Sequence, residues 1–279
     1  MISVVLPVRD AMPWLAAQLE ALVAQRCDEQ WEVVVADNGS RDDSIDVIRS
    51  WAARSPLVRL VQASEKAGPS AARNAGVRAS AGDRLAFCDA DDVVQPGWLA
   101  ALARGLADDD AVAGAFDLSV LNGLPPDDDP GPAATGQLGF LPAGLAANLA
   151  VRRAAFEAVG GFDEEMAVGE DIDLCWRLQL EGYTFAVAGA AVVAKRERVG
   201  AGALFGRAFA YGRCGPRLYR RYRGRGARRD VAGSARSWAW LVMALPRLGR
   251  RDVRRRWIRA AGVRLGRLVG SVAARVLFP

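Results

Sequence analysis

The sequence of 279 residues contains no histidine and only four cysteines. Without histidine, Ser-His-Asp and Cys-His catalysis are excluded, as is every histidine-ligated metal site. Chemistry must therefore rely on carboxylates, hydroxyls, amides and arginines. The cysteines form no C-x-x-C pair, so structural disulfides and zinc sites are poorly supported and a reducing cytosol is expected. They are Cys27, Cys88, Cys175 and Cys214.

Long hydrophobic runs are also missing. The longest apolar stretch near the C-terminus is WAWLVMALP at 238–246, well short of the ~20 residues of a membrane-spanning helix. The N-terminal MISVVLPVRD lacks both the basic and the long apolar region of a signal peptide and is typical of a strand. We therefore expect a cytoplasmic protein without a membrane-crossing helix.

Acidic residues are scarce in the last third of the chain. Residues 195–279 carry 3 Asp and Glu against 23 Lys and Arg, whereas residues 1–194 carry 29 against 14. The net charges are therefore −15 for the first part (14 − 29) and +20 for the last (23 − 3). Two regions that meet different partners are expected.

Short apolar runs alternate with helical patterns in the first hundred residues. Such alternation predicts an α/β fold, a mixed and mostly parallel sheet with helices on both faces, whose ligands bind at the carboxyl ends of the strands. Residues 147–194 are expected to add a strand, a turn at Gly160-Gly161, a helix from about Glu170 to Glu181 and two short strands. The segment LPPDDDPGPAATG at 124–136 is typical of a surface loop, and no role is predicted for residues 112–147. The expected strands are 2–6, 31–36, 58–61 and 85–88, and the expected helices are 14–25, 42–54 and 70–79.

Three carboxylates follow the apolar run RLAFC, in Asp89-Ala90-Asp91-Asp92. Mg²⁺ and Mn²⁺ take oxygen ligands and commonly use one or two carboxylates together with substrate phosphates. Taken alone, the pattern is more typical of a solvated acidic turn that precedes a helix, because short motifs often mislead. Its place directly after a strand shifts the balance toward a metal site.

Three further constellations each allow a structural and a functional interpretation. Asp37-Asn38-Gly39-Ser40 follows a strand, where Ser40 and Asp43 could cap a helix or Asp37 could bind a nucleotide. Arg73 in SAARNAG could be a surface arginine or could contact phosphate. The pair Glu170-Asp171 could complement a helix dipole or supply the general base for a sugar hydroxyl.

Taken in order, these segments resemble the family 2 glycosyltransferases of the GT-A fold, over roughly residues 2–200. Each motif is weak alone, but seven in this order and spacing are specific. The segments are SVVLPVRD at the start, ADNGS at 36–40, SAARNAG at 70–76, CDADD at 88–92, NLAVRR at 148–153, VGGFDE at 159–164 and GEDIDLCWRLQLEGY at 169–183.

The resemblance implies a role for each matching position. Pro7 and Asp37 would line the base and ribose pocket, and Arg73 would lie near the base or the diphosphate. Asp89 would contact the donor and Asp91 the divalent metal, Mg²⁺ or Mn²⁺, with Asp92 sharing this work.

Asp171 is similar to the family's catalytic base, which deprotonates the acceptor hydroxyl in a single inverting displacement. The donor would be a nucleoside diphosphate sugar.

The sequence departs from the family in two places. Relatives often carry a histidine shortly after the last strand, whereas this chain reads AVVAKRERVG. We expect Lys195, Arg196 or Arg198 to bring positive charge to the leaving diphosphate instead. The Gln-x-x-Arg-Trp signature of processive relatives is absent, so transfer of a single sugar is expected. The alternatives are a nucleotidyltransferase, or an inactive nucleotide-sugar-binding or membrane scaffold protein.

The arginine-rich C-terminal part predicts a basic amphipathic helix within Asp252 to Phe278. One interpretation is docking on an anionic membrane, another is packing on the catalytic domain, and a third, nucleic-acid contact, is disfavoured by the acidic front domain. We expect a catalytic domain at 1–200 and a helical extension at 201–279, working at the inner face of the cell membrane on a lipid-linked or envelope acceptor. The apolar positions of this helix are Trp257, Ala261, Leu265, Leu268, Val272 and Val276.

Overall fold

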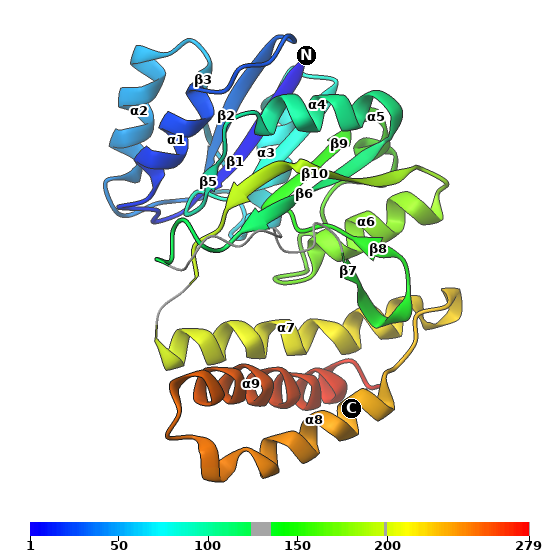
Figure 1. Ribbon diagram of the computed structural model, residues 1–279. Helices are drawn as coiled ribbons and strands as arrows, with labels where there is room; N and C mark the ends of the chain where they lie inside the picture. Colours follow the sequence, from blue (N-terminus) through cyan, green and yellow to red (C-terminus); the bar gives the residue numbers. More distant parts are fainter. Residues whose placement is uncertain (124–134, 198–199, 279) are drawn as a thin grey trace. The chain divides into compact units, whose positions relative to one another are not determined.

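The computed structural model describes residues 1–123, 135–197 and 200–278 (Figure 1). The chain forms two compact units. The first comprises residues 1–135 and 142–197, and the second comprises residues 136–141 and 198–279.

The first unit is built on an eight-stranded mixed sheet in the order β3-β2-β1-β4-β9-β6-β10-β5. Strands β1 to β4 are parallel, β9 is antiparallel to both β4 and β6, β10 is parallel to β6, and β5 is antiparallel to β10. The predicted α/β class with a mostly parallel sheet is confirmed. The strands are β1 (Ile2–Val8), β2 (Trp31–Asp37), β3 (Val58–Gln62), β4 (Arg84–Cys88), β5 (Val93–Val94), β6 (Ala111–Asp117), β9 (Asn148–Arg152) and β10 (Phe185–Ala194).

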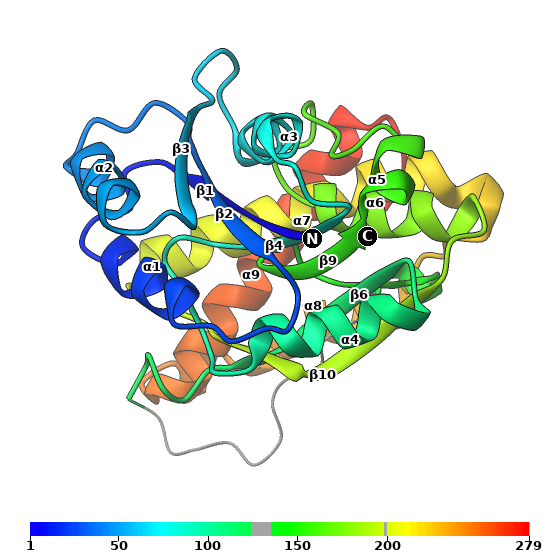
Figure 2. The same ribbon diagram turned by 90° about the horizontal axis from the view of Figure 1, so that it is seen from above.

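Helices cover both faces of this sheet (Figure 2). Side chains alternate between the faces of a strand, so Val4 packs in one cluster with Leu15 and Leu19 of α1. Val5 points the other way, toward Gly76 of α3, where a Cβ would lie 2.5 Å from the Val5 Cγ1 atom. The helices are α1 (Leu15–Val23), α2 (Ser44–Arg54), α3 (Pro69–Ala79), α4 (Trp98–Asp108), α5 (Arg153–Ala158) and α6 (Glu170–Leu180).

Two local predictions were wrong. The expected pair of short strands before Lys195 is a single strand, β10, whose pairing with β6 shifts register between Ala188 and Val192. The cap expected from Ser40 and Asp43 is also not formed: α2 begins at Ser44, whose N–H group donates to Asp42. The Ser40 hydroxyl instead accepts from the N–H group of Asp10. Residues 112–147, for which no role was predicted, supply most of β6 in the middle of the eight-stranded sheet, and the short strands β7 (Thr135–Gly136) and β8 (Pro142–Ala143) lie outside that sheet. The surface loop expected at 124–136 lies almost entirely outside the described residues.

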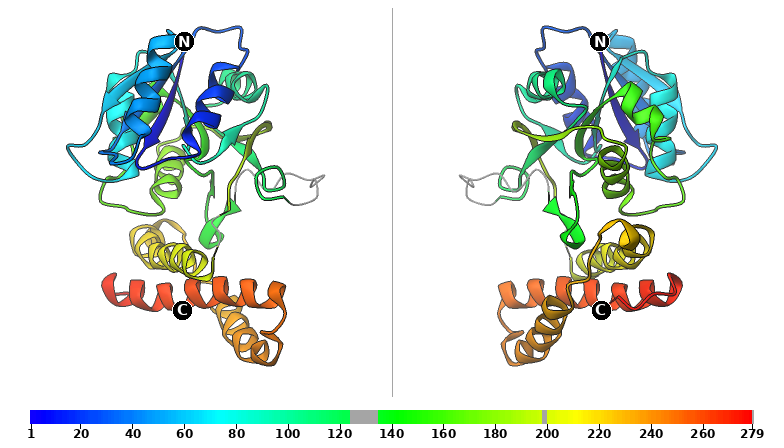
Figure 3. Two further views of the ribbon diagram at one scale, coloured as in Figure 1. Left: turned by 90° about the vertical axis from the view of Figure 1, so that its left-hand side faces the viewer. Right: turned by 90° about the vertical axis from the view of Figure 1, so that its right-hand side faces the viewer.

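The second unit contains three main helices, with α7 and α9 side by side (Figure 3). Glycines on α9 allow this close approach. A Cβ at Gly266 would lie 2.2 Å from the Phe209 carbonyl oxygen, and one at Gly270 would lie 2.7 Å from that of Arg213. None of the helices in the described part of the chain combines the length and the apolar character that a membrane-spanning segment requires. The elements are η1 (Gln137–Gly139), α7 (Ala201–Tyr222), η2 (Arg223–Arg225), α8 (Val231–Met243), η3 (Leu245–Arg247) and α9 (Arg251–Ala273).

Candidate active site

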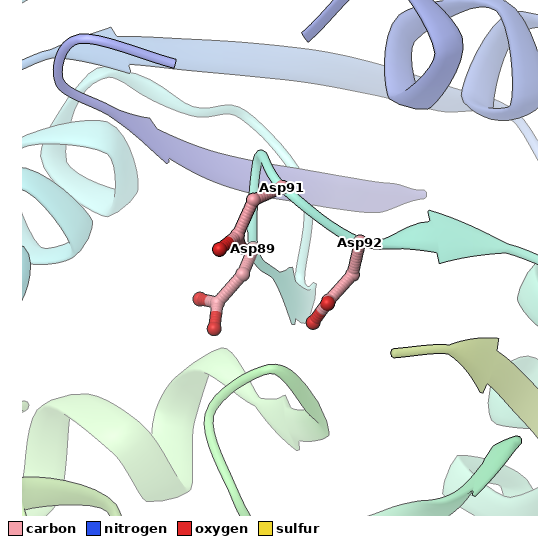
Figure 4. Close-up of side chains that lie close together, drawn as sticks. All are labelled: Asp89, Asp91 and Asp92. Atoms are coloured by element: carbon pink, nitrogen blue, oxygen red, sulfur yellow. The ribbon is translucent and has the colours of Figure 1, made fainter. Parts of the chain in front are cut away.

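The acidic segment after β4 gathers three carboxylates at the carboxyl edge of the sheet (Figure 4). One oxygen from each of Asp89, Asp91 and Asp92 lies within 4.8 Å of the others. Parallel strands end at the same edge of a sheet, so the loop that follows β4 lies beside the end of β1. The solvated-turn interpretation fails for Asp92, which is buried.

A buried glutamine of α1 fixes the backbone of this loop. The Gln18 side-chain amide donates to the carbonyl of Asp89 at 2.9 Å and accepts from the N–H group of Val94 at 3.0 Å. Both ends of the acidic segment are therefore tied to one side chain. No pattern in the sequence marked Gln18, because its role depends on a contact over more than seventy residues.

Lys195 and Arg196 directly follow β10, and both contact the carboxylate of Asp92. The Lys195 ammonium lies 2.8 Å from Oδ2 of Asp92 and 4.0 Å from Oδ2 of Asp89. The Arg196 N–H group donates to Oδ1 of Asp92 at 2.8 Å, and its Nε donates to the Asp91 carbonyl at 3.1 Å. Burial raises the pKa of Asp92 to about 6 and the charge of Asp89 adds to this, against the lowering effect of Lys195.

Arg73 of α3 connects the acidic segment to the start of α6. Its guanidinium donates to Asp89 Oδ1 at 2.7 Å and to Glu170 Oε1 at 3.1 Å. Only 4% of the residue is exposed, which rules out the surface-arginine interpretation. Burial opposes its charge, but attraction from Asp89, Glu170 and Asp171 outweighs burial and raises the pKa of Arg73.

Glu170 and Asp171 are the first residues of α6 and lie in a poorly solvated environment. Burial, together with the charge of Asp171, raises the pKa of Glu170 to about 7, although Arg73 opposes this shift. Burial also raises the pKa of Asp171, whose carboxylate accepts N–H groups from Ile172 and from Ala146. A carboxylate with a raised pKa is a stronger base than a solvated one.

Asp37 and Pro7 lie at the ends of the neighbouring strands β2 and β1. The buried Asp37 carboxylate accepts N–H groups of Gly39 and Ser40 at 3.1 and 3.3 Å, and therefore shapes the turn after β2. Pro7 is half-buried and pairs in register with Ala36. These contacts are structural, and nucleotide binding by either residue stays a prediction.

The structure thus joins several predicted residues in one network of contacts. Arg73, Asp89 and Lys195 are linked directly, and Asp171 is reached through its neighbour Glu170. Arg198 lies outside the described residues. Sequence reasoning gave Glu170 no role of its own, although its place beside Asp171 was a usable signal.

The carboxylates of this site fit a divalent cation. Carboxylate oxygens are the ligands that Mg²⁺ and Mn²⁺ prefer, and Asp89, Asp91 and Asp92 hold three close together. Lys195 already neutralises part of their charge. Lys195 and Arg196 engage both oxygens of Asp92, and Asp89 lies against Arg73 and Lys195. Metal binding by Asp91 and Asp89 stays a prediction.

Comparison with known families gives two matches that follow one another along the chain. The Glycosyl transferase family 2 model matches residues 3–125, and the Glycosyl transferase family group 2 model matches residues 137–265. A pre-mycofactocin glycosyltransferase of Mycobacterium tuberculosis is 29% identical over 263 residues, 88% of this chain and 53% of that protein. Glycosyltransferase AglE of Haloferax volcanii is 28% identical over 204 residues, 67% of this chain and 64% of that protein. The chain therefore spans about half the length of the M. tuberculosis relative.

Solved structures show the same fold. The mannosyltransferase PcManGT from Pyrobaculum calidifontis, in complex with GDP-Man and Mn²⁺, has a TM-score of 0.65 at 17% identity, over 96% of this chain and 86% of that one. TarS 1–349 of S. aureus, in complex with UDP-GlcNAc, has a TM-score of 0.59 at 15% identity, over 100% and 93%. Both are GT-A glycosyltransferases. From the two family matches, these relatives and the shared fold, the chain belongs to glycosyltransferase family 2.

Proposed function

We propose that this protein transfers a single sugar from a nucleoside diphosphate sugar to an acceptor hydroxyl, with inversion at the anomeric carbon. The observation that carries the proposal is the Arg73 bridge between Asp89 and Glu170. This bridge holds Asp89, which contacts the donor in this proposal, close to the carboxylates at the start of α6. An acceptor held against Asp171 would then face a donor held at Asp89.

Asp171 acts in this proposal as the general base. Its carboxylate takes the proton of the acceptor hydroxyl as that oxygen attacks the anomeric carbon. The bond between that carbon and the diphosphate oxygen breaks, and the nucleoside diphosphate leaves. Burial favours this role because it raises the pKa of Asp171 and so its proton affinity.

Positive charge for the leaving diphosphate comes from Lys195 and Arg196, which already lie at the acidic segment. Arg198 follows closely in sequence and is included in this proposal. Pro7 and Asp37 line the nucleotide pocket at the ends of β1 and β2. Asp91 and Asp89 would hold Mg²⁺ or Mn²⁺, and a bound divalent ion neutralises charge that develops on a diphosphate.

The first unit is the catalytic, nucleotide-sugar-binding domain in this proposal, and the arginine-rich second unit serves a lipid-linked or cell-envelope acceptor at the inner face of the cell membrane. The support for the membrane part is the net charge of +20 (23 − 3) in residues 195–279. Anionic lipid headgroups attract such segments.

The test combines binding and turnover. A thermal-shift screen of nucleoside diphosphates and their sugars, with and without Mn²⁺, should identify a stabilising ligand, because binding to the native state raises its stability. Asp171→Asn should keep that shift but lose sugar transfer, or donor hydrolysis, by about 10²- to 10⁴-fold. Glu181→Gln, at the exposed far end of α6, is the matched control and should keep wild-type activity.

Three outcomes would contradict this function. If no nucleotide shifts the melting temperature, the nucleotide-sugar assignment fails. Pyrophosphate release from a nucleoside triphosphate would indicate a nucleotidyltransferase. Donor binding without turnover in the wild type, with every acceptor class tried, would indicate an inactive binding or scaffold protein.

A further inference from the structure

The apolar stripe of α9 faces solvent. Leu265, Leu268, Val269 and Val272 follow the spacing i, i+3, i+4, i+7, so they share one side of the helix. Their exposed fractions run from 42% to 80%. Helix α9 packs against α7 through Gly262, Gly266 and Gly270 instead. Leu265, Leu268 and Val272 of the predicted stripe are therefore exposed, whereas Ala261 is buried and Val276 lies beyond the end of α9.

Helix α8 carries a second exposed apolar stripe. Val231, Ala235, Trp238, Val242 and Leu245 recur at spacings of four, three, four and three, which places them along one side of the helix and the turn that follows. All five are exposed, and Val242 is 66% exposed. A water-soluble surface helix normally shows the reverse pattern, with its apolar side buried.

The two stripes lie on the same side of the α8–α9 pair. The helices meet where the Trp257 indole donates to the Leu241 carbonyl at 2.9 Å. On one side of this contact between the helices, the Arg256 guanidinium lies 4.9 Å from the centre of the Trp240 ring. Successive residues of a helix are rotated by about 100°, and the two helices are antiparallel. Both apolar stripes therefore lie on the side opposite the Arg256–Trp240 contact. They form one surface, which we call the α8–α9 apolar face.

Arginines border this face at the turn between the helices. Arg247, Arg250, Arg251 and Arg254 are all exposed. The nearby Asp252 pairs with Arg250 and is one of only three acidic residues in 195–279. An apolar surface with a basic border is what an anionic bilayer binds, because aliphatic side chains enter the acyl boundary while arginines meet the headgroups.

We propose that the α8–α9 apolar face docks on the surface of an anionic lipid bilayer without crossing it. A second copy of the chain fits this face less well, because its arginines would oppose arginines of the same charge. A nucleic acid would use the arginines but not the aliphatic stripes, since its surface is polar and charged. The inference names the lipid-contacting surface of the membrane-associated enzyme proposed above, and it can be tested without any sugar donor or acceptor.

The experiment is vesicle flotation with the full chain. Vesicles of phosphatidylcholine alone are compared with vesicles that also contain phosphatidylglycerol. The wild type should float with the anionic vesicles and lose binding as salt rises. The double variant Leu268→Gln/Val272→Gln and the single variant Val242→Gln, from different helices of the face, should each weaken this binding, the double variant by about tenfold or more.

The matched control is Val187→Gln on β10, where a valine is 56% exposed in the first unit. It should bind vesicles like the wild type. Arg251→Gln/Arg254→Gln should weaken binding to anionic vesicles and flatten its salt dependence. Circular dichroism melting of each variant checks that the helices stay folded, which is expected because every substituted side chain is exposed.

Four results would overturn the inference. The first is that the wild type fails to float with anionic vesicles. The second is that the folded apolar variants float as well as the wild type. The third is that a single-stranded RNA binds more tightly than the vesicles and is unaffected by Leu268→Gln/Val272→Gln. The fourth is that the apolar variants abolish a dimer seen by sedimentation and leave vesicle binding unchanged. If the wild type floats with anionic vesicles as expected but transfers no sugar, the proposed function fails and the membrane inference stands.

Discussion

The Arg73 guanidinium of α3 donates a 2.7 Å hydrogen bond to Oδ1 of Asp89, in the loop after β4. The same guanidinium also holds Glu170 at the start of α6. One buried cation thus fixes the relative positions of three elements whose carboxylates would otherwise repel. Its position explains why the two acidic motifs can lie close together in a poorly solvated part of the protein.

Replacement of Arg73 should therefore destabilise the protein strongly. Arg73→Met removes the cation that pairs with Asp89 and Glu170. Loss of one partner of a buried ion pair lowers the free energy of unfolding by about 3–5 kcal/mol. Urea denaturation followed by circular dichroism measures the loss. Arg78→Met on the same helix α3, where the arginine is exposed, should change stability by less than about 0.5 kcal/mol. Equal effects of the two variants would show that the Arg73 bridge does not stabilise the fold.

Stability should fall as the pH rises from about 4.5 to 7. Burial raises the pKa of Glu170 from 4.5 to about 7, so in this window the native state binds more protons than the unfolded state. The free energy of unfolding then decreases with pH, by up to about 3 kcal/mol for this group. Asp92, with a pKa raised to about 6, contributes in the same direction.

Glu170→Gln isolates the contribution of Glu170, because glutamine cannot ionise. The free energy of unfolding of this variant should fall less between these pH values than that of the wild type, and the part that remains belongs to the other carboxyls whose pKa is raised by burial, Asp92 and Asp171. Urea denaturation at several pH values measures both slopes. An unchanged slope in Glu170→Gln would mean that Glu170 is not the titrating group.

The glycine contacts between α7 and α9 should tolerate no larger residue. In Gly266→Ala the new Cβ would lie 2.2 Å from the Phe209 carbonyl oxygen and 3.0 Å from the Gly212 Cα, so the helices must move apart. We expect a loss of about 1–3 kcal/mol, measured by thermal melting. Gly206→Ala on α7, where no atom lies within 4 Å of the new Cβ, should instead gain up to about 1 kcal/mol. A neutral Gly266→Ala would contradict the close packing.

Lys195 should weaken the binding of a divalent cation at the acidic segment. Its ammonium lies 2.8 Å from Asp92 and 4.0 Å from Asp89, so it repels a second cation there. Lys195→Met should raise the affinity for Mn²⁺ by about tenfold, as measured by electron paramagnetic resonance of free Mn²⁺, and Asp91→Asn should lower it. Lys66→Met, which changes an exposed lysine paired with Glu164 and Glu165, is the control. If Lys195→Met binds Mn²⁺ no better than the control, the ammonium does not compete with the ion.

Much of the first unit could be predicted from sequence because its signals are local. Continuous apolar runs predicted β1 to β4, and their polar successors predicted where Asp37 and Asp89 would lie. The family resemblance was confirmed by two family matches, over residues 3–125 and 137–265. Strand β6 was missed because its run, AVAGAFD, is rich in alanine and glycine. Its place in the sheet comes from pairing with both neighbouring strands, β9 and β10.

The chain's sequence alone determined the family, the order of β1 to β4 with the helices between them, and the separation of charge between the two parts, because composition and short-range periodicity are properties of the chain itself. Tertiary structure decided that Arg73 bridges Asp89 and Glu170, that Lys195 reaches Asp92 and Asp89, and that α9 packs through glycine while its leucines face solvent. Those outcomes depend on contacts between residues far apart along the chain. Periodicity can place side chains on one side of a helix, but only packing selects which side is buried.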